Sequence, residues 1–193
     1  NGYESPETTH YSVVDQWGNA VSVTTTINLS YGNGCVVEGA GFFLNNEMDD
    51  FSAKPGIPNA FGLIGNEANS IAPGKRPLSS MTPTIVLKEN KPFLVVGSPG
   101  GSTIITTTMQ TILNVVDYEM DIKEAVCAPR FHSQWLPDVI QIEPRGLTKD
   151  VLINLKSRGH EIIYRGAYIG ESNGIMITDE GLFGGGDCRG ETS

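Results

Sequence analysis

Residues 6–14 read Pro6-Glu7-Thr8-Thr9-His10-Tyr11-Ser12-Val13-Val14, and this stretch decides the fold. A second stretch of alternating apolar and polar residues follows at 20–26, after Asp15-Gln16-Trp17-Gly18-Asn19. Alternation with a period of two is typical of half-buried strands, and aspartate, glycine and asparagine favour a turn between them. The sequence therefore predicts a β-hairpin over residues 11–29, with a pair of threonines at its entrance.

The remaining pattern alternates between short strands and helices. We expect a short apolar strand at 39–44 and a long glycine- and proline-rich loop at 52–73. Further strands are predicted at 82–87, 92–97, 139–143, 161–164 and 174–178, and helices at 103–116, 121–126 and 148–158. Hairpin-linked strands followed by helices indicate a layered α+β domain with largely antiparallel sheets.

Length and charge narrow the class of protein. The chain has 193 residues with 39% hydrophobic content, which is enough for one sizeable core and one domain. Its formal net charge of −9 argues against a nucleic-acid partner, and no apolar run approaches the roughly 20 residues that span a bilayer. Because the sequence begins with Asn1 rather than methionine, we interpret it as a piece of a longer precursor.

The chain has three cysteines, Cys35, Cys127 and Cys188. Their odd number and wide spacing give no Cys-x-x-Cys pair and no zinc-binding pattern. We therefore expect buried free thiols, with one internal pair at most, and no metal site.

Thr8 is the candidate nucleophile. A threonine hydroxyl needs an adjacent base, and an N-terminal residue carries one in its own α-amine, whose reference pKa is about 7.7 to 8.0. Residues 1–7 precede Thr8 in the sequence, so this hypothesis requires scission of the Glu7–Thr8 bond, with the Thr8 hydroxyl attacking the preceding carbonyl. The structural alternative is that Thr8 and Thr9 only open a strand.

Two further motifs carry candidate chemistry. Glu47 and Asp50 belong to a cluster of acids that is either a solvated turn or a pocket for a substrate ammonium. Gly100 and Gly101 stand between a predicted strand and a predicted helix, where backbone amides can face an anion. A phosphate loop is the rival interpretation, but no Gly-Lys-Ser/Thr follows.

Together these motifs resemble the small subunit of the γ-glutamyltranspeptidases, which are N-terminal-nucleophile hydrolases. The resemblance runs from about Tyr3 to Arg189. It implies an αββα four-layer sandwich completed by a large subunit from the same precursor. It also implies that 1–7 is a pre-cleavage segment and that 8–193 is the small catalytic subunit.

The resemblance assigns roles to individual residues. Thr8 would be both the processing nucleophile and the residue that the substrate acylates, with Thr26 hydrogen-bonded to its hydroxyl. The amides of Gly100 and Gly101 would stabilise the tetrahedral intermediate. The α-amino and α-carboxylate ends of the substrate would contact Asn28, Glu47, Asp50, Ser79 and Ser80, with an arginine of the large subunit.

A lid over the substrate pocket is implied at 55–66. Some family members have a tyrosine at its tip, where this chain has Phe61. The tail Asp187-Cys188-Arg189 resembles an Asp-Pro-Arg ending of the family, with Cys188 in place of the proline. We attach no function to that tail from the sequence.

The implied activity is a two-step transfer of a γ-glutamyl group from glutathione or a related compound to water, an amino acid or a peptide. It calls for no metal or organic cofactor. Family members usually act in the periplasm or outside the cell. Two alternatives stay open: an acylase for cephalosporins or other amides on the same scaffold, and a catalytically silent, uncut relative that serves as a binding protein.

Overall fold

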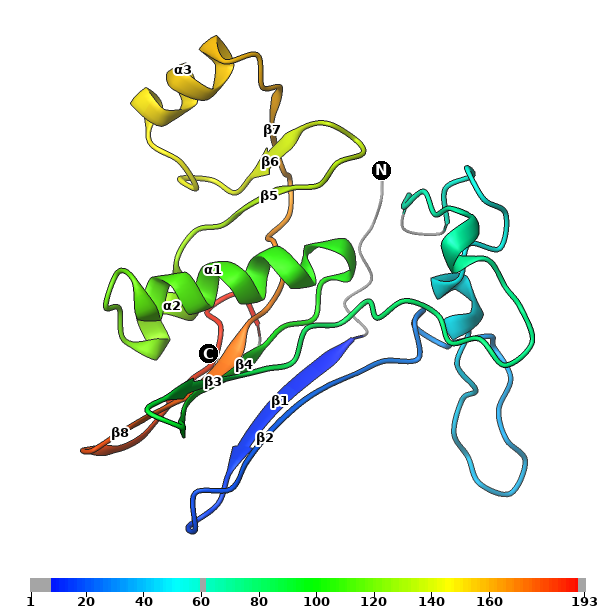
Figure 1. The fold of residues 1–193 in the computed structure, drawn as a ribbon, viewed down its shortest axis with the longest axis horizontal. Helices are drawn as coiled ribbons and strands as arrows, with labels where there is room; N and C mark the ends of the chain where they lie inside the picture. The colour runs from blue at the N-terminus through cyan, green and yellow to red at the C-terminus, as the bar shows by residue number, and fades with distance from the viewer. Residues whose placement is uncertain (1–7, 60–61, 191–193) are drawn as a thin grey trace.

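The computed structural model describes residues 8–59 and 62–190 (Figure 1). Its strands are β1 (Thr9–Val14), β2 (Ala20–Thr25), β3 (Thr84–Lys88), β4 (Lys91–Gly97), β5 (Phe131–Ser133), β6 (Ile140–Ile142), β7 (Ile162–Tyr164), β8 (Asn173–Thr178) and β9 (Gly181–Gly185). Its α-helices are α1 (Ile104–Val116), α2 (Ile122–Cys127) and α3 (Lys149–Ser157). Short 3-10 helices are η1 (Glu47–Asp50), η2 (Glu67–Asn69) and η3 (Gly101–Thr103).

The predicted N-terminal hairpin is confirmed. Strands β1 and β2 pair antiparallel, from Thr9 opposite Thr25 to Val14 opposite Ala20. The Asp15 carboxylate accepts hydrogen bonds from the backbone amides at positions 17 and 19, which closes the turn as a short polar side chain commonly does. The open end of the hairpin therefore holds the residues just before β1 close to those just after β2.

A second, antiparallel sheet has the strand order β3-β4-β8-β9. The hairpin lies against one face of it, since β1 and β2 both contact β4. Ser12 of β1 donates its hydroxyl to the backbone carbonyl of Val95, and Ser22 of β2 donates to that of Val96. Small hydroxyl side chains thus replace bulky apolar ones where the two sheets meet.

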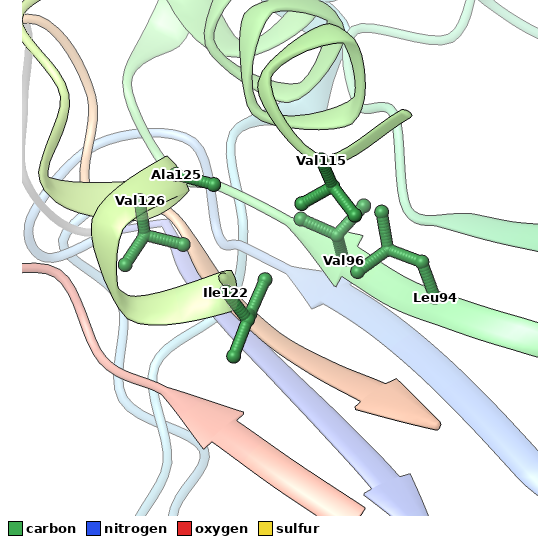
Figure 2. Packing of buried hydrophobic residues seen from close by; sticks show 6 residues of the cluster. All are labelled: Leu94, Val96, Val115, Ile122, Ala125 and Val126. Carbon is green, nitrogen blue, oxygen red and sulfur yellow. The ribbon is translucent and has the colours of Figure 1, made fainter. Parts of the chain in front are cut away.

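Helices α1 and α2 cover the opposite face of this sheet (Figure 1). The buried core between helices and sheet is apolar, as Figure 2 shows, and consists of Leu94, Val96, Val115, Ile122, Ala125 and Val126. Burying a side chain such as Leu94 or Ile122 contributes about 1.5–3 kcal/mol relative to exposure. This core fixes α1 on the sheet.

The layers accordingly run helices, sheet, sheet, which accounts for three layers of the predicted αββα sandwich. The outer face of the hairpin carries Tyr11, Val13 and Val21, each about half exposed. Figure 1 shows α1 and α2 on the far side of the second sheet from this face. The predicted mixed α+β layering is confirmed.

A small subdomain extends from the second half of the chain, with strand order β5-β6-β7 and helix α3. Strands β6 and β7 pair in parallel because α3 crosses over between them, which departs from the otherwise antiparallel pattern. Helix α3 has no buried residue, so the rest of the described chain does not enclose it.

The strand predicted at 39–44 is wrong. Gly39 and Gly41 have φ values of 80° and 74°, and the backbone turns so that Val37 donates to the carbonyl of Phe42. Left-handed backbone at two glycines is incompatible with a regular strand. Conversely, the glycine-rich stretch at 181–185 forms β9, because it pairs along β8.

The expectation of buried thiols is also wrong, since Cys35 and Cys188 are exposed and Cys127 is partly buried. Among the residues that the structure describes, no helix has the length and apolar character needed to cross a bilayer. The same residues contain no group of three or more histidine, cysteine or acidic side chains arranged to hold a metal ion.

Candidate active site

A cavity of about 240 Å³ lies at the open end of the hairpin. It brings together residues that are far apart in the sequence but that were mostly expected to share a site. Its lining consists of Thr8, Thr26, Asn28, Glu47, Asp50, Asn59, Leu63, Leu78, Ser79, Ser80, Met81, Gly101, Ser102, Ile104, Ile105 and Gln134.

Thr8 and Thr26 stand side by side at this end. Their hydroxyl oxygens are 3.2 Å apart, and Thr26 Oγ1 also accepts the backbone amide of Asn28 at 2.9 Å. The pairing of Thr9 with Thr25 one residue further along the hairpin fixes this juxtaposition. A hydroxyl held by two neighbours in this way can orient the Thr8 oxygen toward the cavity.

His10 follows Thr8 by two residues on β1 and has a structural role there. It is buried, its Nδ1 is 2.8 Å from Thr24 Oγ1, and its Nε2 is 3.2 Å from Ser12 Oγ. Burial lowers the pKa of His10 to about 4, so the ring is neutral near pH 7. A neutral imidazole satisfied by two hydroxyls supports the strand that carries Thr8.

Asn28 joins the end of β2 to the acidic turn. It is buried, its φ is 73°, and its side-chain amide donates to the carbonyl of Asn46 at 3.3 Å. The Asn46 side chain in turn accepts the backbone amide of Leu29 at 3.1 Å. Asparagine tolerates the left-handed region better than most residues, which suits it to this position. The reciprocal contacts place η1 beside the threonines.

Glu47 and Asp50 both face the cavity from η1. Glu47 Oε1 is buried and has no hydrogen-bond partner in the described part of the chain. Burial, reinforced by the nearby Asp50 carboxylate, raises the pKa of Glu47 to about 7. Two close carboxyl groups with an unmatched buried oxygen form a site that a cationic group would complete.

Ser79 and Ser80 line the same side of the cavity. Ser80 donates its hydroxyl to Asp50 Oδ2 at 3.0 Å, and Ser79 donates to the carbonyl of Met81 at 3.1 Å. Asn69, which sequence reasoning missed, ties this segment to η1 by donating to the Asp50 carbonyl and accepting from the Leu78 amide. An asparagine inside a long loop carries no pattern that would reveal such a role.

The two glycines at the start of α1 are placed differently. Gly101 lines the cavity and Gly100 does not. Gly100 has a φ of 135° and its carbonyl accepts the amide of Thr103, which begins the turn into α1. A Cβ on Gly100 would stand 3.0 Å from the Cα of Gly170, so a side chain is excluded there. The backbone thus approaches the cavity at a helix start, where amides favour negative charge.

The loop that was expected to form a lid contributes two residues to the cavity wall. Asn59 and Leu63 line the cavity, and their backbones are linked by a hydrogen bond from the Asn59 amide to the Leu63 carbonyl. The Leu63 amide donates to Asn59 Oδ1 at 2.9 Å. Phe61 at the predicted tip lies outside the described residues, as does Glu7 of the predicted cleavage site.

Sequence reasoning also missed the wall formed by Ile104, Ile105 and Gln134. The two isoleucines begin α1 directly after η3, so their position three and four residues after Gly101 is a signal that could have been used. Gln134 arrives from the loop after β5, where its Oε1 lies 2.7 Å from Nε2 of the buried His132. Nothing in the local sequence indicates that contact.

A buried charge network lies behind the glycine turn. Arg130 donates to Asp187 Oδ2 at 2.6 Å and to the carbonyl of Ile169 at 2.7 Å. Arg189 pairs with Glu143 at 2.6 Å and with Asp187 at 2.8 Å. Burial lowers the pKa of Arg130, and Asp187 opposes that effect. The network therefore supports Ile169 and the adjacent turn that packs on the glycines.

Comparison with known proteins identifies the family of this chain. A family model described as gamma-glutamyltranspeptidase matches residues 1–193. The chain is 53% identical to the glutathione hydrolase proenzyme of Escherichia coli K12 over 97% of its own length and 32% of that protein. It thus spans about a third of the curated relatives it matches.

Among solved structures, a threonine-to-alanine mutant of Helicobacter pylori gamma-glutamyltranspeptidase superposes with a TM-score of 0.88. It is 59% identical to this chain, and the match covers 94% of this chain and 100% of that one. A cephalosporin acylase from Bacillus halodurans is more distant, at 27% identity and a TM-score of 0.78 over 97% of this chain and 35% of that one. With most of the described candidate residues lining one cavity, the family match along the whole sequence shows that the chain belongs to the gamma-glutamyltranspeptidase family.

Proposed function

We propose that this chain provides the nucleophile of a γ-glutamyltransferase that also acts as a glutathione hydrolase. The observation that carries the proposal is the shared cavity, in which the paired hydroxyls of Thr8 and Thr26 face the carboxyl groups of Glu47 and Asp50. A nucleophile beside a cation-seeking pocket suits an acyl donor that carries an α-ammonium group.

Maturation comes first in this proposal. The Thr8 hydroxyl attacks the carbonyl of residue 7, the peptide bond between them breaks, and water hydrolyses the resulting ester. The products are a segment that ends at residue 7 and a catalytic subunit, 8–193, that begins with Thr8. The freed α-amine of Thr8 then serves as the base, since its reference pKa of about 7.7–8.0 leaves part of it neutral near pH 7.

In turnover, the α-amine takes the proton of the Thr8 hydroxyl as the oxygen attacks the γ-carbonyl of the donor. The backbone amide of Gly101, which lines the cavity, stabilises the tetrahedral oxyanion together with that of Gly100 just before it, and one such donor is worth about 2.7–4 kcal/mol. The leaving amine, cysteinylglycine for glutathione, departs with the proton. Water or the amine of an amino acid or peptide then accepts the γ-glutamyl group.

Substrate recognition in this proposal depends on charge. The α-ammonium of the donor lies between Glu47 and Asp50 and donates a hydrogen bond to the buried Oε1 of Glu47, which lacks a partner in the described chain. Asn28 contacts the same end, and Ser79 and Ser80 hold the α-carboxylate. In the present structure both serine hydroxyls donate within the chain, so their protons must reorient on binding.

The proposal includes a partner and a location. A large subunit from the same precursor would cover the exposed outer face of the hairpin and add an arginine to the carboxylate site. The share of each relative that this chain matches leaves room for such a subunit. We place the assembled enzyme in the periplasm or outside the cell by its resemblance to family members.

The central test uses the full protein that contains this chain. Thr8→Ala should abolish both backbone cleavage and release of p-nitroaniline from γ-glutamyl-p-nitroanilide, whereas Thr8→Ser should keep both at a reduced rate. N-terminal sequencing of the wild-type protein should find a chain that begins at Thr8. Turnover by Thr8→Ala, or by wild-type protein that is never cut, would refute the mechanism, and an uncut inactive protein would favour a binding role.

One pair of substrates distinguishes the acylase alternative from the proposed transferase. Glutaryl-p-nitroanilide matches γ-glutamyl-p-nitroanilide except that it lacks the α-amine. Without that amine, Glu47 Oε1 stays buried and unmatched, so the γ-glutamyl compound should be strongly preferred in kcat/KM. A preference for the glutaryl compound would support the acylase instead.

A further inference from the structure

Cys127 and Cys188 are adjacent in space although 61 residues separate them in sequence. Cys127 ends α2, and Cys188 follows β9 in the C-terminal segment. The Cys188 thiol lies 3.9 Å from the carbonyl oxygen of Cys127. This contact brings one thiol against the backbone of the other cysteine, and close approach of the two residues is the first requirement for a disulfide.

Other contacts hold the two segments together on both sides of the pair. Lys123 of α2 donates to the carbonyl of Gly186 at 2.8 Å. Arg189 donates from Nη1 to the carbonyl of Val126 at 3.0 Å and from Nη2 to that of Ala128 at 2.9 Å. The approach of the two thiols therefore does not depend on the thiols themselves, and their effective concentration is high.

The two cysteines differ in solvent accessibility, which suits them to act one after the other in thiol–disulfide exchange. Cys188 is exposed, so a small disulfide in solution can reach it, and Cys127 is partly buried beside it. Burial and the neighbouring Cys188 raise the pKa of the Cys127 thiol, which makes it the slower thiol to attack a disulfide from solution. An exposed attacking thiol with a shielded neighbour is the arrangement of a dithiol that closes on itself.

We propose that Cys127 and Cys188 form a thiol–disulfide exchange site that a small-molecule disulfide, such as oxidised glutathione, converts to an internal disulfide. The Cys188 thiolate attacks one sulfur, which forms a mixed disulfide and releases one reduced thiol. The Cys127 thiolate then attacks the sulfur of Cys188 and displaces the second reduced thiol. The oxidant gains two electrons and two protons, and the two cysteines lose them.

The position of the bond gives it a structural consequence. Cys188 stands between Asp187 and Arg189, the residues that pair with Arg130 and Glu143 in the buried charge network. A covalent link to α2 would tether both residues to that helix. Closing a loop of this size constrains the unfolded chain and raises the stability of the folded one.

The first experiment treats the full protein with reduced and oxidised glutathione in graded ratios, then blocks free thiols and maps the peptides. We expect a linked Cys127–Cys188 peptide, about 2 Da lighter than the sum of its reduced parts because two hydrogen atoms are lost. The exposed Cys35 should instead acquire a glutathione adduct, which shows that the oxidant acted. Recovery of Cys127 and Cys188 as free thiols or as separate adducts would overturn the proposal.

The second experiment measures thermal unfolding with matched variants. Oxidised wild-type protein should melt higher than reduced protein, by on the order of 5 °C for a stabilisation of a few kcal/mol in a domain of this size. Cys35→Ser should keep this shift, and Cys127→Ser and Cys188→Ser should each abolish it. Equal melting temperatures for linked and reduced protein would contradict the tethering role. Neither experiment depends on catalytic activity, so the result stands apart from the proposed function.

Discussion

The imidazole of His10 occupies the space that a side chain at position 97 would need. A Cβ built on Gly97 would stand 2.3 Å from His10 Cε1 and 2.4 Å from Nδ1. Both positions lie at the interface of the two sheets, His10 on β1 and Gly97 at the end of β4. The strand that carries Thr8 can approach the second sheet only because residue 97 has no side chain.

Replacing Gly97 with alanine should therefore displace His10 and, two residues earlier, Thr8. We expect a destabilisation of about 1–3 kcal/mol, typical of overpacking, together with impaired backbone cleavage and turnover. Urea unfolding and the rate of p-nitroaniline release measure the two effects. Gly184→Ala is the matched control, because a Cβ there meets nothing within 4 Å. A Gly97→Ala protein as stable and active as this control would disprove the steric argument.

Thr26 should matter through its hydroxyl alone. Valine has nearly the same shape, but Thr26→Val removes the oxygen that contacts Thr8 and accepts the Asn28 amide. Losing interactions worth about 1–3 kcal/mol predicts a fall in kcat of roughly 10- to 100-fold. Thr26→Ser keeps the oxygen and should stay within a few-fold of the wild type. Similar kcat values for the valine and serine variants would mean that the hydroxyl has no part in positioning Thr8.

Glu47 should make stability depend on pH. Its pKa is about 7 in the folded protein, above the ordinary value of 4.5, because of burial and the nearby Asp50. The folded state therefore binds the proton more tightly than the unfolded state, and the stabilisation is present below pH 4.5 and lost as the pH rises to about 7. Glu47→Gln should lack this loss. As the pH rises across this interval, the urea midpoint of Glu47→Gln should increase relative to that of the wild type. Above the interval, the difference between the two midpoints should stay constant.

The same group should couple substrate binding to proton release. A substrate ammonium between Glu47 and Asp50 favours the ionised carboxyl, so binding below pH 7 must expel a proton. The KM for γ-glutamyl-p-nitroanilide should therefore rise as the pH falls below about 7, where Glu47 is protonated. In Glu47→Gln this pH dependence of KM should disappear. A wild-type KM that stays flat between the ordinary pKa of 4.5 and the shifted pKa of about 7 would exclude the ammonium site.

Asp187 should be a large single contributor to stability outside the apolar core. It is buried and accepts from both Arg130 and Arg189, so its removal leaves buried guanidinium charge uncompensated. Asp187→Ala should cost about 3–5 kcal/mol, measured by chemical denaturation. Asp179→Ala, in the exposed turn after β8, is the control and should change stability by no more than about 0.5 kcal/mol. A cost for Asp187→Ala close to that of the control would show that the network is not stabilising.

Much of this architecture was predictable because the hairpin and the sheet-helix unit obey local rules. The hairpin predicted over 11–29 is confirmed as β1 and β2, and the strand predicted at 92–97 is confirmed as β4, which begins one residue earlier. The failures share a cause. Residues 39–44 are apolar but pair only through an isolated bridge between Val36 and Phe43 in the described part of the chain, and β9 is glycine-rich but lies beside β8. Strand pairing is decided by neighbours that a local pattern does not contain.

The active site likewise contains residues that the sequence predicted and residues that it did not. Thr8, Thr26, Glu47 and Asp50 were assigned from resemblance to family motifs, and the structure places them around one cavity. The residues that hold them were not predictable, because each acts across a long sequence separation. Asn69 reaches back 19 positions to Asp50, and Arg130 reaches forward 57 positions to Asp187. A supporting role of this kind leaves no periodic signal in the sequence.

The first rung of the hairpin, Thr9 opposite Thr25, would restrain the terminus that a cut ahead of Thr8 creates. Freshly exposed chain ends in most proteins fray, because nothing restrains their last few residues. Here the strand pairing begins at the residue after Thr8, so the new N-terminus would be held in place as soon as it forms. Maturation would then need no refolding step before the first substrate is attacked.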